Sequence, residues 1–138
     1  MSALSLASFK DLLLSIFTDP EAFNYDVSVF EGLRQNISGK FTLQIFPTNQ
    51  RETTQAENVV SVVDTWQIAG VVNTNEENVV SDVIQFLGDV KSNIDKLSFD
   101  ERDFTYAILP DAQISYEGYP YVVFNLQLEV SYIRRINS

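Results

Sequence analysis

The feature that most constrains this fold is the side-chain pattern of residues 119–135. Apolar residues occupy alternate positions, and polar residues fall between them. A period of two with branched and aromatic residues on one side is typical of a half-buried β-strand. A shift of one residue would turn the apolar side into water, so the pattern also fixes the register. We expect the rest of the chain to pack on or beside this strand, through Val122, Phe124, Leu126, Leu128, Val130 and Tyr132.

Shorter alternating patterns predict the other strands. Pro47 is expected to end one of them, because proline cannot donate a backbone hydrogen bond to a neighbouring strand. Gly70 is expected to mark a β-bulge, and the single Trp66 to lie in the core or at its edge. The predicted strands cover residues 25–29, 41–46, 59–72, 103–109 and 113–116, and residues 117–120 form the turn into the last strand.

Two stretches have the three-to-four spacing of amphipathic helices. The first covers residues 4–17, with Ser5 or Ser8 as its cap. The second covers residues 79–97, preceded by a capping box in which Thr74 and Glu77 satisfy the first amide groups. Its predicted apolar stripe consists of Val80, Val83, Ile84, Phe86, Leu87, Val90, Ile94 and Leu97.

The surroundings of the second helix are acidic. Residues 74–103 contain eight acidic and three basic side chains, a net charge of −5 that is half of the total of −10. If the helix buries its apolar stripe, the opposite face is expected to be strongly negative. Such a face either is simply solvated or turns toward a basic partner or toward something that must not adhere.

These elements predict a single α+β domain over residues 1–138. The length suffices for one hydrophobic core, and no linker or internal repeat divides it. Helices and strands do not alternate regularly, which argues against a parallel β-α-β fold. We therefore expect a mostly antiparallel sheet with two helices packed on one face and a long β-hairpin loop.

That loop is residues 48–58, which lie between two predicted strands and contain one small apolar residue. We expect the mobile end of an extended hairpin, either a flexible loop or a segment that orders against a partner. Arg134 and Arg135 form a basic pair at the end of the last strand, either solvated or paired with an acidic neighbour. The candidate interface residues are Thr48, Asn49, Gln50, Arg51, Glu52, Thr53, Thr54, Gln55, Arg134 and Arg135.

Composition excludes several classes of chemistry. The chain has no cysteine and no histidine, which removes disulfides, thiol nucleophiles and the commonest general base and metal ligand. Asp100, Glu101 and Asp103 form an acidic cluster, but their spacing is not that of a calcium loop. We expect no enzyme activity, no catalytic residue, no cofactor and no metal. We also expect no membrane association, no small-molecule substrate and no specific nucleic-acid binding, given the charge.

The order and spacing of the elements resemble those of the tail terminator (tail completion) proteins of long-tailed bacteriophages. The resemblance rests on residues 41–46, 66–72, 79–97 and especially the sequence Phe-Asn-Leu-Gln-Leu-Glu-Val-Ser-Tyr-Ile of residues 124–133. It is a likeness of pattern over nearly the whole chain, without a diagnostic motif.

The resemblance implies a structural virion protein that forms a ring, expected to be hexameric, at the head-proximal end of the tail tube. Such a ring stops tube polymerisation and joins the tail to the head through head-completion and connector proteins. The implied partners are other copies of the chain, the tube protein and DNA that passes through the lumen unbound. The implied location is the virion neck, after synthesis in the host cytoplasm.

Two alternatives remain open from the sequence. The chain could be another neck or tail-tube component, in which case its rings would stack instead of stopping at one. It could also be a non-viral binding or regulatory domain, which would dimerise or bind a ligand and show no six-fold state.

Overall fold

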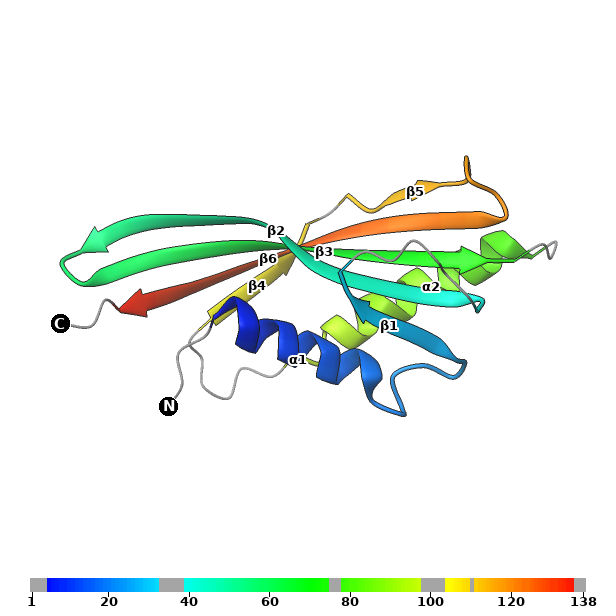
Figure 1. The fold of residues 1–138 in the computed structure, drawn as a ribbon, viewed down its shortest axis with the longest axis horizontal. Helices are drawn as coiled ribbons and strands as arrows, with labels where there is room; N and C mark the ends of the chain where they lie inside the picture. The colour runs from blue at the N-terminus through cyan, green and yellow to red at the C-terminus, as the bar shows by residue number, and fades with distance from the viewer. Residues whose placement is uncertain (1–4, 33–38, 75–77, 98–103, 110, 136–138) are drawn as a thin grey trace.

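The computed structural model of the protein describes residues 5–32, 39–74, 78–97, 104–109 and 111–135 (Figure 1). Two helices, α1 (Leu6–Thr18) and α2 (Val79–Ile94), accompany one six-stranded sheet. The strands are β1 (Val27–Glu31), β2 (Phe41–Ala56), β3 (Val59–Asn73), β4 (Phe104–Ile108), β5 (Gln113–Ser115) and β6 (Tyr121–Arg135). Their order is β1-β2-β3-β6-β4, with β5 also paired to β6, and only the β1–β2 pair is parallel. The predicted α+β fold is confirmed.

The strand β6 is central to the sheet, as its pattern predicted. It pairs antiparallel with β3 over its whole length, from Tyr121 opposite Asn73 to Arg135 opposite Val59. Its other edge pairs with β5 near the start and with β4 near the end. The residues at alternate positions of β6 from Val122 to Tyr132 are buried. The predicted register and burial of this strand are confirmed.

Both helices cover the same face of the sheet, which we call the inner face. The ring of Phe9 on α1 lies 5.8 Å from that of Trp66 on β3, and the ring of Phe86 on α2 lies 5.3 Å from that of Phe124 on β6. Phe124 lies directly opposite Gly70 of β3, which is four residues from Trp66. Residues an even number apart on a strand point to the same face, so Trp66 and Phe124 lie on one face of the sheet. Trp66 is a core residue, as expected, with 1% of its surface exposed.

The two helix starts differ in how well they were predicted. Ser5 caps α1, and Ser5 and Ser8 form a reciprocal capping box, so both predicted candidates take part. Thr74 does not cap α2, because the helix begins at Val79 with Asn78 in the capping position and no side-chain cap. Thr74 is buried, and its amide donates to the Pro120 carbonyl at 3.1 Å. Glu77, the other half of the predicted box, lies outside the described residues.

Gly70 does not mark a bulge. The register on both sides is continuous there, with Leu43 and Phe124 directly opposite Gly70. The ring of Phe124 lies against the Gly70 Cα, where a Cβ atom would overlap it. Glycine at this position makes room for the fully buried ring of Phe124 on the neighbouring strand. The bulges lie instead in β2, between Pro47 and Asn49 and between Thr54 and Ala56.

The outer surface of α2 is not acidic, which corrects the prediction. Asp82 pairs with Lys40 at 3.0 Å, and Asp89 accepts a 2.6 Å hydrogen bond from the Tyr25 hydroxyl, so both carboxylates lie on the flanks. Val80 and Ile84, predicted to be buried, are 50% and 62% exposed. Successive residues are 100° apart around a helix, which turns Ile84 away from the buried side of Val83, Phe86 and Val90. The exposed positions are Val80, Ser81, Ile84, Gln85, Gly88 and Ser92, all uncharged.

Candidate assembly surface

The strand β2 continues through Pro47 to Ala56, and this extension overturns the prediction of a loop at residues 48–58. Residues 49–56 pair with β3 as far as Val59, so the loop shrinks to a turn at Glu57 and Asn58. Asn58 has a φ of 66°, the left-handed conformation that tight hairpins need and that asparagine tolerates. Pro47 is accommodated because β1 pairs only with residues 41–45 of β2, so the strand is at an edge and next to a bulge.

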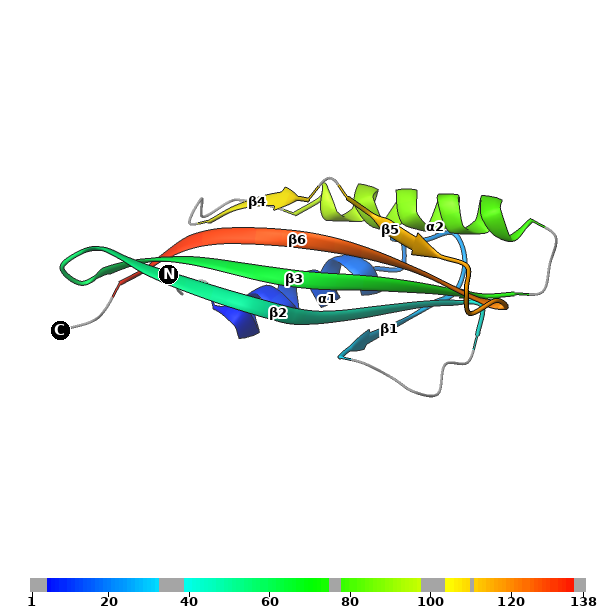
Figure 2. The same ribbon diagram turned by 90° about the horizontal axis from the view of Figure 1, so that it is seen from above.

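The ends of three strands form an arm that projects beyond both helices (Figures 1 and 2). We define the arm as residues 48–56 of β2, 59–65 of β3 and 129–135 of β6. Every residue of β2 in the arm is exposed. The arm therefore presents two sheet faces, an inner one continuous with the helix side and an outer one opposite to it.

The structure brings the candidate interface residues together on this arm. Arg134 donates to a Glu52 carboxylate oxygen through Nε at 3.1 Å and also through Nη2. This contact joins β6 to β2 across β3 and places both residues on the inner face. Successive residues of a strand point to opposite faces, so Arg135 and Arg51 lie on the outer face. The basic pair predicted as one unit is thus divided between the two faces.

The inner face of the arm contains a buried polar contact that sequence reasoning did not identify as a site. Asp64 is 1% exposed, and its Oδ1 accepts a 2.8 Å hydrogen bond from Nε2 of Gln50. Burial raises the pKa of the Tyr132 hydroxyl above its usual range, and the neighbouring Asp64 carboxylate raises it further. A signal was present in the sequence, because Asp64 falls on the apolar side of the β3 alternation.

A second polar contact lies at the opposite end of the sheet. The hydroxyl of Tyr25 donates to Asp89, and burial together with that hydrogen bond raises the Tyr25 pKa. The ring of Tyr25 stacks beside Phe41, with ring centroids 4.5 Å apart. The residues between α1 and β1 also form an open hollow of about 470 Å³ lined by Phe17, Phe23, Tyr25, Val27 and Val29 among others. These contacts hold α2 and the loop between α1 and β1 against the sheet.

The described residues offer no grouping that suggests metal chemistry. No set of three or more acidic residues among them is arranged to hold a metal ion. The acidic residues Asp100, Glu101 and Asp103 lie outside the described residues. In the described part of the chain, no helix is long and apolar enough to cross a membrane.

Comparison with known proteins identifies a structural likeness. Neither a scan of protein-family models nor a search of curated proteins finds a sequence match. Among solved structures, the chain is similar to the sheath/tube terminator of PVC, an extracellular contractile injection system, determined by cryo-EM in the extended state. The match has a TM-score of 0.65 and 11% sequence identity, and it covers 100% of this chain and 59% of that chain. This chain has a terminator-like fold.

Proposed function

We propose that this protein is a structural subunit that ends a tail tube. The observation that supports this most strongly is that the likeness to a sheath/tube terminator extends over the whole of this chain. The arm supports it as well, because its outermost strand, residues 48–56 of β2, is polar apart from Ala56 and exposed throughout, and so is available for contacts with other chains. The match covers 59% of the longer terminator chain, so the proposal relies only on the region of that protein that this chain matches.

The proposed working form is a ring of copies, expected to be hexameric, at the head-proximal end of the tube. In this position the ring contacts the tube protein on one side and head-completion or connector proteins on the other. It stops polymerisation because it binds the last tube ring without offering the surface that another tube ring would need. The proposed location is the neck of a virion or a related contractile particle.

The acidic charge supports a role around a DNA passage. With a net charge of −10, the chain repels a phosphate backbone at short range, so DNA would pass through the ring without being held. The outer surface of α2 is uncharged, so this helix face is not the source of that repulsion.

Negative-stain microscopy of the concentrated protein, with its mass from light scattering, tests the proposal. We expect discrete single rings of constant mass. Stacks that lengthen with concentration would instead indicate a tube component. A stable dimer would indicate a binding or regulatory domain of another kind.

A further inference from the structure

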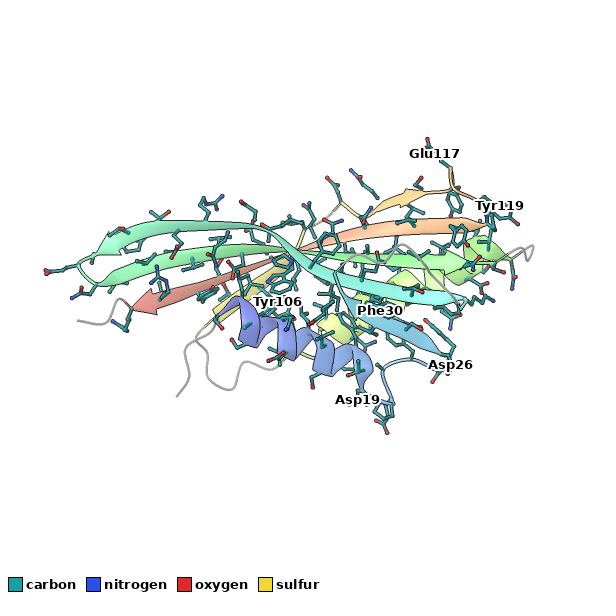
Figure 3. All side chains as sticks on the ribbon, in the orientation of Figure 1. Asp19, Asp26, Phe30, Tyr106, Glu117 and Tyr119 are labelled. Atoms are coloured by element: carbon teal, nitrogen blue, oxygen red, sulfur yellow. The ribbon has the colours of Figure 1, made fainter. Side chains whose placement is uncertain are left out.

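The end of the sheet opposite the arm has an unusual surface. The turn between β5 and β6 and the first residue of β6 expose three tyrosines, Tyr116, Tyr119 and Tyr121, at 42%, 52% and 43% of their surfaces. Glu117 lies in the same turn and is exposed, and Figure 3 shows Glu117 and Tyr119 projecting from this end. We call these four residues the aromatic end. Tyrosine is enriched in protein interfaces, where its ring supplies contact area and its hydroxyl a hydrogen bond.

The outer face of the arm carries complementary groups. Arg51, Ile133 and Arg135 are exposed there, and neither arginine has an acidic partner within the described part of the chain. By contrast, Arg134 on the inner face is already paired with Glu52. An arginine can stack on a tyrosine ring and pair with a carboxylate at the same time. The exposed outer side of the arm therefore carries two cations, with Glu129 half-buried on the same face, whereas the other end displays an exposed carboxylate and three exposed tyrosines.

The twist of the sheet orients these two surfaces so that copies can follow one another. At the arm, β2 lies above β3 and β6 in Figure 1, whereas at the aromatic end it lies below them. The outer face consequently points in opposite directions at the two ends. The outer face of one arm can therefore meet the aromatic end of a neighbour, where Tyr121 lies on the outer face by its register, while both copies keep the same general direction.

We propose that the outer face of the arm binds the aromatic end of a second copy of this chain, and that this contact builds the ring. The inference rests on the proposed ring function. Copies with a net charge of −10 repel each other, so a contact that joins the exposed Arg51 and Arg135 to Glu117 is favoured over contacts between acidic surfaces. Two different patches at opposite ends of β6 make a head-to-tail interface, which closes into a ring when the rotation between copies allows it.

Disulfide trapping tests this contact, because the chain has no cysteine of its own. Thr53→Cys places a thiol on the outer face between Arg51 and Arg135, and Ser115→Cys places one beside the aromatic end; both sites are exposed. When the two variants are mixed under mild oxidation, a covalent heterodimer is expected. Ser92→Cys, exposed on α2, is the matched control for Ser115→Cys and should give no such product.

Charge reversal shows whether the proposed groups hold the contact. Adding Arg51→Glu and Arg135→Glu to the Thr53→Cys chain should abolish the cross-link. Adding Glu117→Lys to the Ser115→Cys chain should then restore it. Equal cross-linking to Ser92→Cys, or a product that charge reversal leaves unchanged, would overturn the proposed contact.

The double variant with both cysteines separates this inference from the proposed function. A ladder of linked copies that ends at one fixed size supports both. An open-ended ladder supports the contact and contradicts the ring. Absence of cross-linking while the unmodified protein forms rings overturns the contact alone, and absence of both cross-links and rings overturns both.

Discussion

The two halves of β6 belong to one strand but to different surroundings. The first half, around Phe124, lies under α2 in a cluster of aromatic rings that includes Phe86 and Phe41. The second half, around Arg134, runs into the arm, where residues of β2 are exposed on both faces. The inner side of the first half therefore lies within the core, whereas the second half leaves the core after Tyr132 and ends in exposed residues, 133–135, that are available for contacts with other chains.

The largest effect is expected at Phe124, whose ring is fully buried between Gly70 and Phe86. Phe124→Ala should lower the free energy of unfolding by about 3–5 kcal/mol, because it removes the ring's contacts and leaves a cavity. Chemical denaturation measures this change. A loss below about 1 kcal/mol would show that the first half of β6 is not the centre of the core.

A smaller loss is expected when Gly70 gains a side chain. Gly70→Ala places a methyl group where the Phe124 ring lies, so the ring or the strands must shift. Overpacking of this kind typically costs about 1–3 kcal/mol, measured by the same denaturation experiment. Gly88→Ala is the matched control, since nothing lies within 4 Å of a Cβ at that position. It should stabilise the protein slightly, because alanine favours a helix over glycine.

The buried phenols predict a dependence on alkaline pH. The pKa values of Tyr132 and Tyr25 are raised above the usual value of 10.0, chiefly by burial. As the pH rises above 10.0, the unfolded chain loses these protons before the folded one does, so the free energy of unfolding falls. The slope from each group is at most about 1.4 kcal/mol per pH unit.

Phenylalanine variants test the origin of this slope. Tyr132→Phe and Tyr25→Phe should each make the alkaline decline shallower in denaturation curves collected at several pH values. An unchanged slope in both variants would mean that other groups cause the decline.

The smallest effect is expected for the ion pair on the arm. Arg134 and Glu52 are both partly exposed, and such pairs contribute about 0.2–1 kcal/mol. A double-mutant cycle with Arg134→Ala and Glu52→Ala measures the coupling between the two side chains. A coupling of several kcal/mol would contradict the expectation that this partly exposed pair adds little to the stability of the fold.

The sequence predicted those elements whose two faces differ in polarity. The alternation in β6 and the apolar spacing in α1 and α2 each record which side faces the core, so burial could be inferred from the pattern. The strand at residues 48–56 was not predicted, because both faces of this part of β2 are exposed to water. Its backbone hydrogen bonds to β3 do not affect the hydropathy pattern. The same pattern is produced by a loop.

Two further differences have the same kind of cause. Gly70 can signal either a bulge or space for a ring, and only the position of Phe124 on the neighbouring strand decides between them. The net charge of residues 74–103 does not reveal which side of α2 its acidic residues occupy. Asp82 and Asp89 lie on the flanks of the helix, where they contact Lys40 and Tyr25. The candidate interface residues stay a prediction from the sequence, and their division between the two faces of the arm required the sheet register.

The central claim is that copies of this chain assemble into a closed ring that ends a tube. The most direct test is negative-stain microscopy of the purified, concentrated protein, with its mass from light scattering at several concentrations. We predict single rings of one size whose mass stays constant as concentration increases. A stable dimer, a monomer at every concentration or stacks that lengthen with concentration would contradict the claim.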